Sequence, residues 1–143
     1  MDLELYYQTE WIRVAKNFNR AKHKGFKDKE DFADWYINQL KANNCECHYC
    51  KTSIHDIRQL IEAGILKERK IGNGFRGKIL EVDKNDDDYT KDHCVLSCYY
   101  CNNDKSYTSE KDEYREYFGT NRNIYFRKLM IKMAGNISNE YNI

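Results

Sequence analysis

The sequence contains no proline and few aliphatic residues, and its charges almost cancel. Ile, Leu, Val and Phe account for 29 of the 143 residues, which is near the lower limit for a globular chain. The net charge of +1 nevertheless argues against a disordered chain, and aromatic residues make up 14% of the sequence, twelve of them Tyr. We therefore expect one folded domain, or a small domain with helical additions, in which tyrosines supplement a thin aliphatic core.

The sequence also lacks any apolar run near the roughly 18 residues that a membrane helix needs. Its first ten residues are acidic and do not have the shape of a signal peptide. We therefore expect a soluble, cytoplasmic protein without contact to a membrane. In that reducing compartment, six cysteines favour metal binding or reactive thiols over disulfides. The absence of proline, in a chain rich in Asn, Lys, Ile and Tyr, is consistent with an AT-rich coding sequence.

The small net charge hides three charged segments of opposite sign. Residues 11–29 carry a net charge of +6 and residues 66–78 a net charge of +4, whereas residues 81–92 carry −4. A partner responds to such local fields rather than to the sum. Basic segments around an acidic pocket suit a protein that handles a polyanion with metal ions, although solvated helix faces give the same pattern.

Hydrophobic periodicity predicts an α+β chain with several helices and one β-hairpin. Alternating residues at 78–83 and 94–97 predict two paired strands, joined by a polar loop that includes Asp86, Asp87 and Asp88. Glycines predict a flexible loop at 72–77 and a helix stop at Gly119, and we expect the tail to fray from Gly135. Helices are expected at 3–22, 28–44 with Asp28 as N-cap, 54–65, 99–105, 109–118 and 123–134.

Four cysteines form two C-x-x-C units, Cys47 with Cys50 and Cys98 with Cys101, separated by 47 residues. Two such knuckles complete a tetrahedral zinc site, with sulfurs about 2.3 Å from the metal and no open position for substrate. We therefore predict a structural Zn²⁺, whose binding would compensate for the thin core.

Two alternatives concern the cysteines. The C-x-x-C cysteines could instead be small buried residues or a redox pair. Cys45 and Cys94 are left over, and either could replace a member of a knuckle. Because Cys94 lies at the start of a predicted strand, we assign it to the core.

Residues 80–84 and 89–106 resemble the motif of HNH endonucleases. The likeness consists of an Asp near the end of a strand, paired C-x-x-C units and the C-N-x-x-K sequence that begins at Cys101. The resemblance implies a small ββα-metal finger with two zinc knuckles, embedded in additional helices. It divides the chain into an N-terminal helical region at 1–44, the zinc-bound HNH-like core at 45–108 and C-terminal helices at 109–143.

The resemblance also implies a catalytic metal site and a DNA substrate. It does not separate a restriction, homing or phage role. The metal-binding Asp of the family corresponds to Asp83, and its closing His or Asn to Asn102. A carboxylate and an amide are hard oxygen ligands, suited to Mg²⁺ or Mn²⁺. The usual general-base His corresponds to Lys84, which would contribute positive charge to the scissile phosphate, and the middle Asn corresponds to His93.

Three residues are candidates for the general base that the motif does not supply. His93 comes first because it lies near the site in the predicted loop. The other two follow from a branch that includes PacI-type restriction enzymes, which has a cation after the Asp and uses an upstream His and a Tyr of the first knuckle. These correspond to His23 and then Tyr49 in this chain.

Double-stranded DNA is the expected partner, and a homodimer is left open. Cations that could contact its phosphates are Arg13, Lys16 and Arg20, at helical spacing, and Arg76 and Lys78 beside the site. The first hypothesis is a zinc-containing, metal-dependent DNA endonuclease. The rivals are a non-catalytic zinc module that binds nucleic acid and a thiol redox protein.

Overall fold

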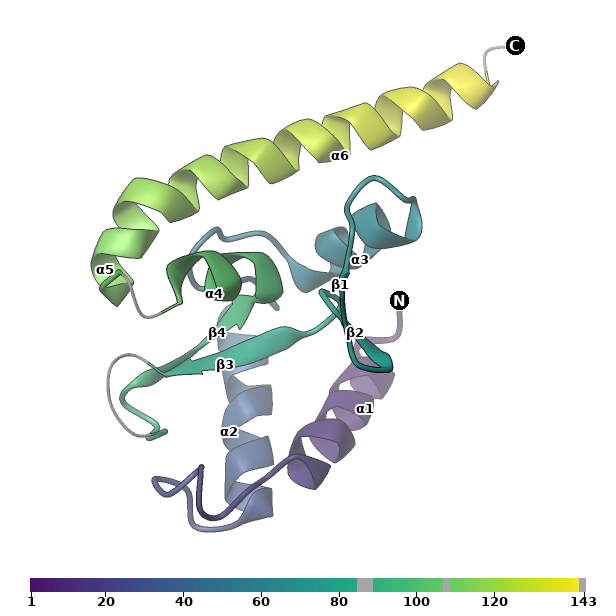
Figure 1. The fold of residues 1–143 in the computed structure, drawn as a ribbon. Coiled ribbons are helices and arrows are strands. Elements are labelled where there is room, and N and C mark those ends of the chain that lie inside the picture. The colour runs from purple at the N-terminus through teal and green to yellow at the C-terminus, as the bar shows by residue number, and fades with distance from the viewer. Residues whose placement is uncertain (85–88, 107–108, 142–143) are drawn as a thin grey trace.

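The computed structural model describes residues 1–84, 89–106 and 109–141, and the side chains of these residues up to 136. The chain is a mixture of helices and short antiparallel strands, which confirms the coarse fold class (Figure 1). The elements are α1 (Leu3–Lys16), α2 (Lys29–Ala42), α3 (Ile54–Glu62), β1 (Arg69–Ile71), β2 (Gly74–Arg76), β3 (Leu80–Lys84), β4 (Cys94–Cys98), α4 (Tyr99–Lys105), α5 (Lys111–Tyr114), the π-helical segment η1 (Arg115–Gly119) and α6 (Thr120–Tyr141).

The centre of the fold is the antiparallel pair of β3 and β4, which confirms the predicted hairpin strands. The register runs from Leu80 opposite Cys98 to Lys84 opposite Cys94. α4 follows β4 without a loop and packs on both strands, while α2 packs on β4 from the other side (Figure 1). Asp86, Asp87 and Asp88, which were predicted to lie in the connecting loop, fall outside the described residues.

The prediction of a flexible loop at 72–77 was wrong, because this segment forms most of a second hairpin. β1 and β2 pair antiparallel, with Ile71 opposite Gly74, so that only Gly72 and Asn73 remain for the turn. Gly72 has φ +62°, the backbone conformation that a tight two-residue hairpin turn requires at its first position. The glycines therefore serve turn geometry and do not signal flexibility.

The N-terminal helix ends earlier than its periodicity predicts, at Lys16 instead of residue 22. The Asn19 side-chain oxygen accepts hydrogen bonds from the backbone N–H groups of Ala21 (2.9 Å) and Lys22 (3.1 Å). This local bonding competes with helix formation. The predicted N-cap of α2 is confirmed, since the Asp28 carboxylate accepts from the backbone N–H of Asp31 at 2.8 Å.

The C-terminal region contains a long helical run instead of two helices separated at Gly119. Helical structure continues from α5 through η1 into α6 and reaches Tyr141, beyond Gly135, from which the tail was expected to fray. Gly119 is needed for a different reason: a Cβ atom there would overlap the backbone carbonyl of Tyr49. A glycine that could end a helix therefore allows two backbones to approach closely.

Tyrosines fill much of the core, as the composition predicts. Tyr36, Tyr49 and Tyr114 are among the largest fully buried side chains, and each hydroxyl has a partner. Tyr36 donates to the carbonyl oxygen of Leu80 (2.6 Å), and Tyr114 donates to the carboxylate of Asp104 (2.9 Å). Such bonds let amphipathic rings replace aliphatic side chains without leaving buried polar groups unpaired.

In the described part of the chain, no helix combines the length and the apolar character needed to cross a membrane.

Replacing Gly119 with Ala tests the close approach to Tyr49. Alanine normally favours a helix over glycine, so without the contact the variant would gain stability. Because the added Cβ meets backbone, we expect Gly119→Ala to lower the free energy of unfolding by about 1–3 kcal/mol in urea denaturation. Gly135→Ala is the matched control, since nothing lies within 4 Å of its Cβ. Equal stability gains in both variants would contradict the contact.

Candidate functional site

Four buried thiols converge between the loop that follows α2 and the junction of β4 with α4. The sulfurs of Cys47, Cys50, Cys98 and Cys101 all lie within 4.8 Å of one another. Backbone N–H groups inside each knuckle donate to sulfur at 3.4 Å, from Tyr49 to Cys47 and from Cys101 to Cys98. Four soft ligands at this spacing fit a metal such as zinc and leave no ligand position for a substrate. The predicted four-cysteine cluster is confirmed.

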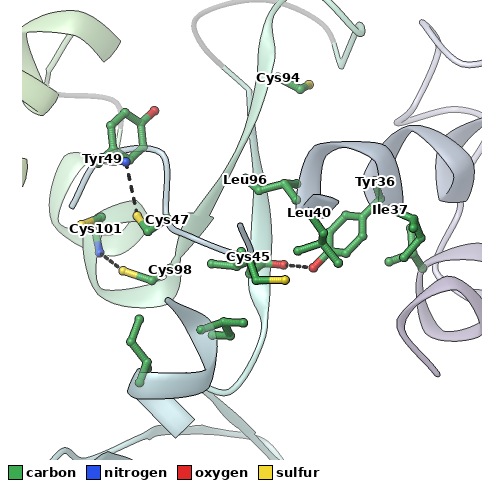
Figure 2. Close-up of a cluster of buried hydrophobic side chains, with 14 of the residues drawn as sticks. Tyr36, Ile37, Leu40, Cys45, Cys47, Tyr49, Cys94, Leu96, Cys98 and Cys101 are labelled. Atoms are coloured by element: carbon green, nitrogen blue, oxygen red, sulfur yellow. Dashed lines mark hydrogen bonds between the residues drawn. The ribbon is translucent and has the colours of Figure 1, made fainter. Parts of the chain in front are cut away.

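The two remaining cysteines lie apart from the cluster (Figure 2). Cys45 is buried against the hydroxyl of Tyr7, with 4.0 Å between sulfur and oxygen. Cys94 is buried in β4 opposite Lys84, which agrees with its assignment to the core. Burial raises the pKa of the Cys45 thiol and raises the pKa of Cys94 to about 11, so both are protonated at neutral pH.

The first knuckle brings Tyr49 against Asp83. The Tyr49 ring is buried, and its hydroxyl donates a short hydrogen bond to the Asp83 carboxylate. The buried Lys105 approaches the same carboxylate oxygen, with 3.5 Å between Nζ and Oδ2. Burial, followed by the bond to Asp83, raises the pKa of Tyr49 well above its usual value, so the phenol keeps its proton here. Asp83 is thus held from two sides.

Asp83 and Asn102 line one cavity of about 540 Å³ between β3 and α4. The Asn102 side-chain nitrogen donates to the Glu81 carboxylate at 2.9 Å, which turns the amide oxygen away from Glu81. Glu81 in turn forms an ion pair with Arg76. Side chains of Arg76, Lys84 and Lys105 also line the cavity, so its wall carries more positive than negative charge. Such a wall favours an anionic ligand such as a phosphate.

A second cavity of about 290 Å³ adjoins the first and shares Arg76 and Asn102 with it. His23 lines this second cavity and is only 6% exposed, because its ring stacks on Phe32 with 4.3 Å between ring centroids. Its Nδ1 accepts from the backbone N–H of Asn19 at 3.0 Å. Burial, and then the charge of Lys22, lowers the pKa of His23. The ring is therefore neutral at pH 7 and carries its proton on Nε2.

The other predicted site residues lie away from the Asp83 cavity. His93 is exposed, and its Nδ1 lies 2.8 Å from the Thr90 hydroxyl. Arg13 lines the second cavity but is bonded to Glu10 (2.8 Å) and to Tyr36, which makes it part of the packing between α1 and α2. Three cations, Lys16, Arg20 and Lys78, are exposed at the surface outside both cavities.

Sequence reasoning assigned no role to Glu81 or Lys105. Glu81 contacts Asn102 and Lys105 contacts Asp83, the two residues predicted to bind the catalytic metal. Glu81 lies two residues before Asp83 in β3, so strand alternation places both side chains on one face of the sheet. Lys105 is the last residue of the C-N-x-x-K sequence, and one helical turn separates it from Cys101. Both signals were present in the sequence, but the contacts depend on how α4 packs against β3.

The chain matches no family model, and neither the curated proteins nor the solved structures contain a match to it.

Replacing one clustered cysteine tests whether the four thiols hold a structural metal. We expect Cys50→Ser to lose bound zinc, measured by elemental analysis, because three thiolates no longer close the coordination shell. The thermal unfolding midpoint should fall by about 10 °C or more, since a few °C accompany each kcal/mol lost. Cys45→Ser is the matched control, because Cys45 is equally buried outside the cluster. Full zinc content in Cys50→Ser would contradict the assignment.

Proposed function

We propose that the chain is a metal-dependent endonuclease that hydrolyses phosphodiester bonds in duplex DNA. In this proposal β3, β4 and α4 are the ββα finger of an HNH-type site, and the cysteine cluster holds the structural zinc. The observation that carries the proposal is the shared cavity of Asp83 and Asn102, with Tyr49 of the first knuckle on Asp83. The same arrangement supports a likeness to the PacI-type branch.

The residues at this cavity fit a hard divalent cation. Asp83 offers a carboxylate and Asn102 an amide oxygen, both of which suit Mg²⁺ or Mn²⁺ better than they suit zinc. When bound, such a cation would neutralise charge on the phosphate and stabilise the leaving oxygen. Tyr49 and Lys105 hold the carboxylate in place, and Glu81 orients the amide.

Positive side chains at the cavity would position the phosphate. Lys84 is exposed at the end of β3 and lines the cavity, with its Nζ 5.5 Å from the centre of the Tyr89 ring. Arg76 lines both cavities, so its charge spans the route between them. Cations aimed at a phosphate favour the more highly charged transition state of its hydrolysis.

His23 and Tyr49, and not His93, are the residues proposed to orient the attacking water and to accept its proton. Neutral His23 can orient a water molecule or a phosphate oxygen through its Nε2–H. Tyr49 is the candidate acceptor of the proton from the attacking water, a role open only to its phenolate, so the hydroxyl proton now donated to Asp83 must first pass to solvent when substrate and cation bind. His93 is exposed and outside both cavities, which argues against the first-ranked candidate.

The endonuclease proposal predicts metal-dependent nicking of plasmid DNA. We expect cleavage with Mg²⁺ or Mn²⁺, reduced about a hundredfold or more in Asp83→Asn, which removes the negative charge of one proposed ligand, and in Asn102→Ala, which removes the other ligand. Asn38→Ala, in an exposed position of α2, should cut like the wild type. The readout is conversion of supercoiled to open-circular or linear DNA.

One observation favours a non-catalytic zinc module that binds nucleic acid. Lys84 occupies the position of the usual general-base His, and lysine is protonated at neutral pH unless its pKa is strongly lowered. Duplex binding without any nicking, in all metals and salt concentrations tried, would establish this alternative and contradict the endonuclease.

Three variants test the assignment of the proton-handling residues. We expect Tyr49→Phe to reduce cleavage by about a hundredfold or more and His23→Ala by about tenfold, since one is the proposed acceptor and the other orients groups. His93→Ala should retain activity within about twofold, because its imidazole faces solvent beside Thr90. Single-turnover cleavage rates are the measurement. A large loss in His93→Ala with normal rates in Tyr49→Phe would reverse the assignment.

A further inference from the structure

The hairpin of β1 and β2 carries an excess of positive charge and an exposed aromatic side chain. The hairpin and its flanks carry one acidic residue, Glu68, and Phe75 is 63% exposed. The neighbouring Ile71, at the turn, is 46% exposed. The cations in this segment are Lys67, Arg69, Lys70, Arg76 and Lys78.

Strand register divides these side chains between the two faces of the hairpin. Lys70 pairs directly with Phe75, and Arg69 pairs directly with Arg76. Because side chains alternate along a strand, Lys70 and Phe75 share one face, while the two arginines share the other. A cation therefore lies opposite an aromatic ring on a single exposed surface.

The arginine face is turned toward α4 and β3. The Arg76 guanidinium forms an ion pair with Glu81 and lies 4.7 Å from the centre of the Tyr99 ring. Arg69 donates to the Tyr99 hydroxyl (3.3 Å) and to the Asn103 side-chain oxygen (3.4 Å). These contacts fix the orientation of the hairpin, so the face that holds Lys70 and Phe75 is directed away from the body of the protein.

The hairpin also adjoins the proposed catalytic cavity. Arg76, the last residue of β2, lines the cavity of Asp83 and Asn102 as well as the neighbouring one. A polyanion with one phosphate in the Asp83 cavity would therefore reach the hairpin within a short distance along its backbone. A two-stranded ribbon is narrow enough to enter a groove of duplex DNA.

We infer that the β1–β2 hairpin is a DNA-contacting ribbon, in which Lys70 binds a phosphate of duplex DNA and Phe75 inserts between neighbouring base pairs. The inference rests on the proposed function, because it takes DNA as the substrate of the adjoining site. Charge complementarity favours this partner, since cations predominate around the exposed ring. An apolar wedge beside a phosphate contact unstacks a base step and fixes the position of the duplex.

Binding of a labelled DNA duplex, measured by fluorescence anisotropy, tests the inference with the full chain purified with its zinc. The buffer contains no Mg²⁺ or Mn²⁺, so affinity is measured without cleavage. We expect Phe75→Ala to weaken binding about tenfold, and Lys70→Ala to lower the slope of log affinity against log salt by about 1. Tyr117→Ala is the control for Phe75, since both rings are 63% exposed, and the exposed Lys132 of α6 is the control for Lys70.

A second readout separates insertion from simple attraction to phosphates. A duplex that contains 2-aminopurine should become more fluorescent on binding, because unstacking relieves quenching, and Phe75→Ala should remove this increase while Tyr117→Ala keeps it. A duplex RNA of the same sequence should bind more weakly, since its major groove is too deep and narrow for a ribbon and its minor groove is too shallow to hold one. Unchanged affinity and salt slope in both hairpin variants, no 2-aminopurine signal with the wild type, or equal binding of RNA would overturn the inference.

The outcomes also distinguish this inference from the endonuclease proposal. If the chain binds DNA through Lys70 and Phe75 but never cuts it, the ribbon inference stands and the endonuclease proposal fails. If the chain cuts plasmid DNA while both hairpin variants bind like the wild type, the endonuclease proposal stands and the ribbon inference fails.

Discussion

The structure depends on the convergence of four thiols from two distant parts of the chain. Cys50 and Cys98 are separated by 47 residues, and their sulfurs lie 4.0 Å apart. The backbone N–H of His48 also donates to the carbonyl oxygen of Leu96 at 2.8 Å, so the first knuckle is joined to β4 directly. Because aliphatic residues are scarce, a metal bound at these thiols would supply cohesion that a larger hydrophobic core provides elsewhere.

The parts of the fold that the sequence predicts are those encoded by local spacing. The C-x-x-C units, the alternation in β3 and β4 and the cap at Asp28 each involve residues only a few positions apart in the sequence. Two of the errors concern Gly72 and Gly119, because glycine permits a turn, a helix stop or a close contact. Only the pairing of β1 with β2, or the approach of a second backbone, decides among these uses.

At the candidate site, too, local sequence patterns could be predicted and contacts that depend on tertiary packing could not. Asp83 and Asn102 were identified from a motif, and they do line one cavity. The sequence could not show that His23 would be buried on Phe32, or that His93 would face solvent, since both outcomes depend on tertiary packing. Glu81 lacked a role for a related reason: its value lies in contacts to Asn102 and Arg76, which come from other elements.

Tyr49 stands between two of the clustered cysteines, and this position gives one tetrapeptide two separate duties. Its ends supply sulfurs to the cluster, while its third residue reaches the Asp83 carboxylate and its backbone meets Gly119. A mutation that lengthened or shortened the spacer would rotate the phenol away even if the sulfurs could still converge. Insertions and deletions are therefore less tolerable here than in ordinary surface loops. A change in the length of this tetrapeptide would disturb the cysteine cluster and the contact of Tyr49 with Asp83 at the same time.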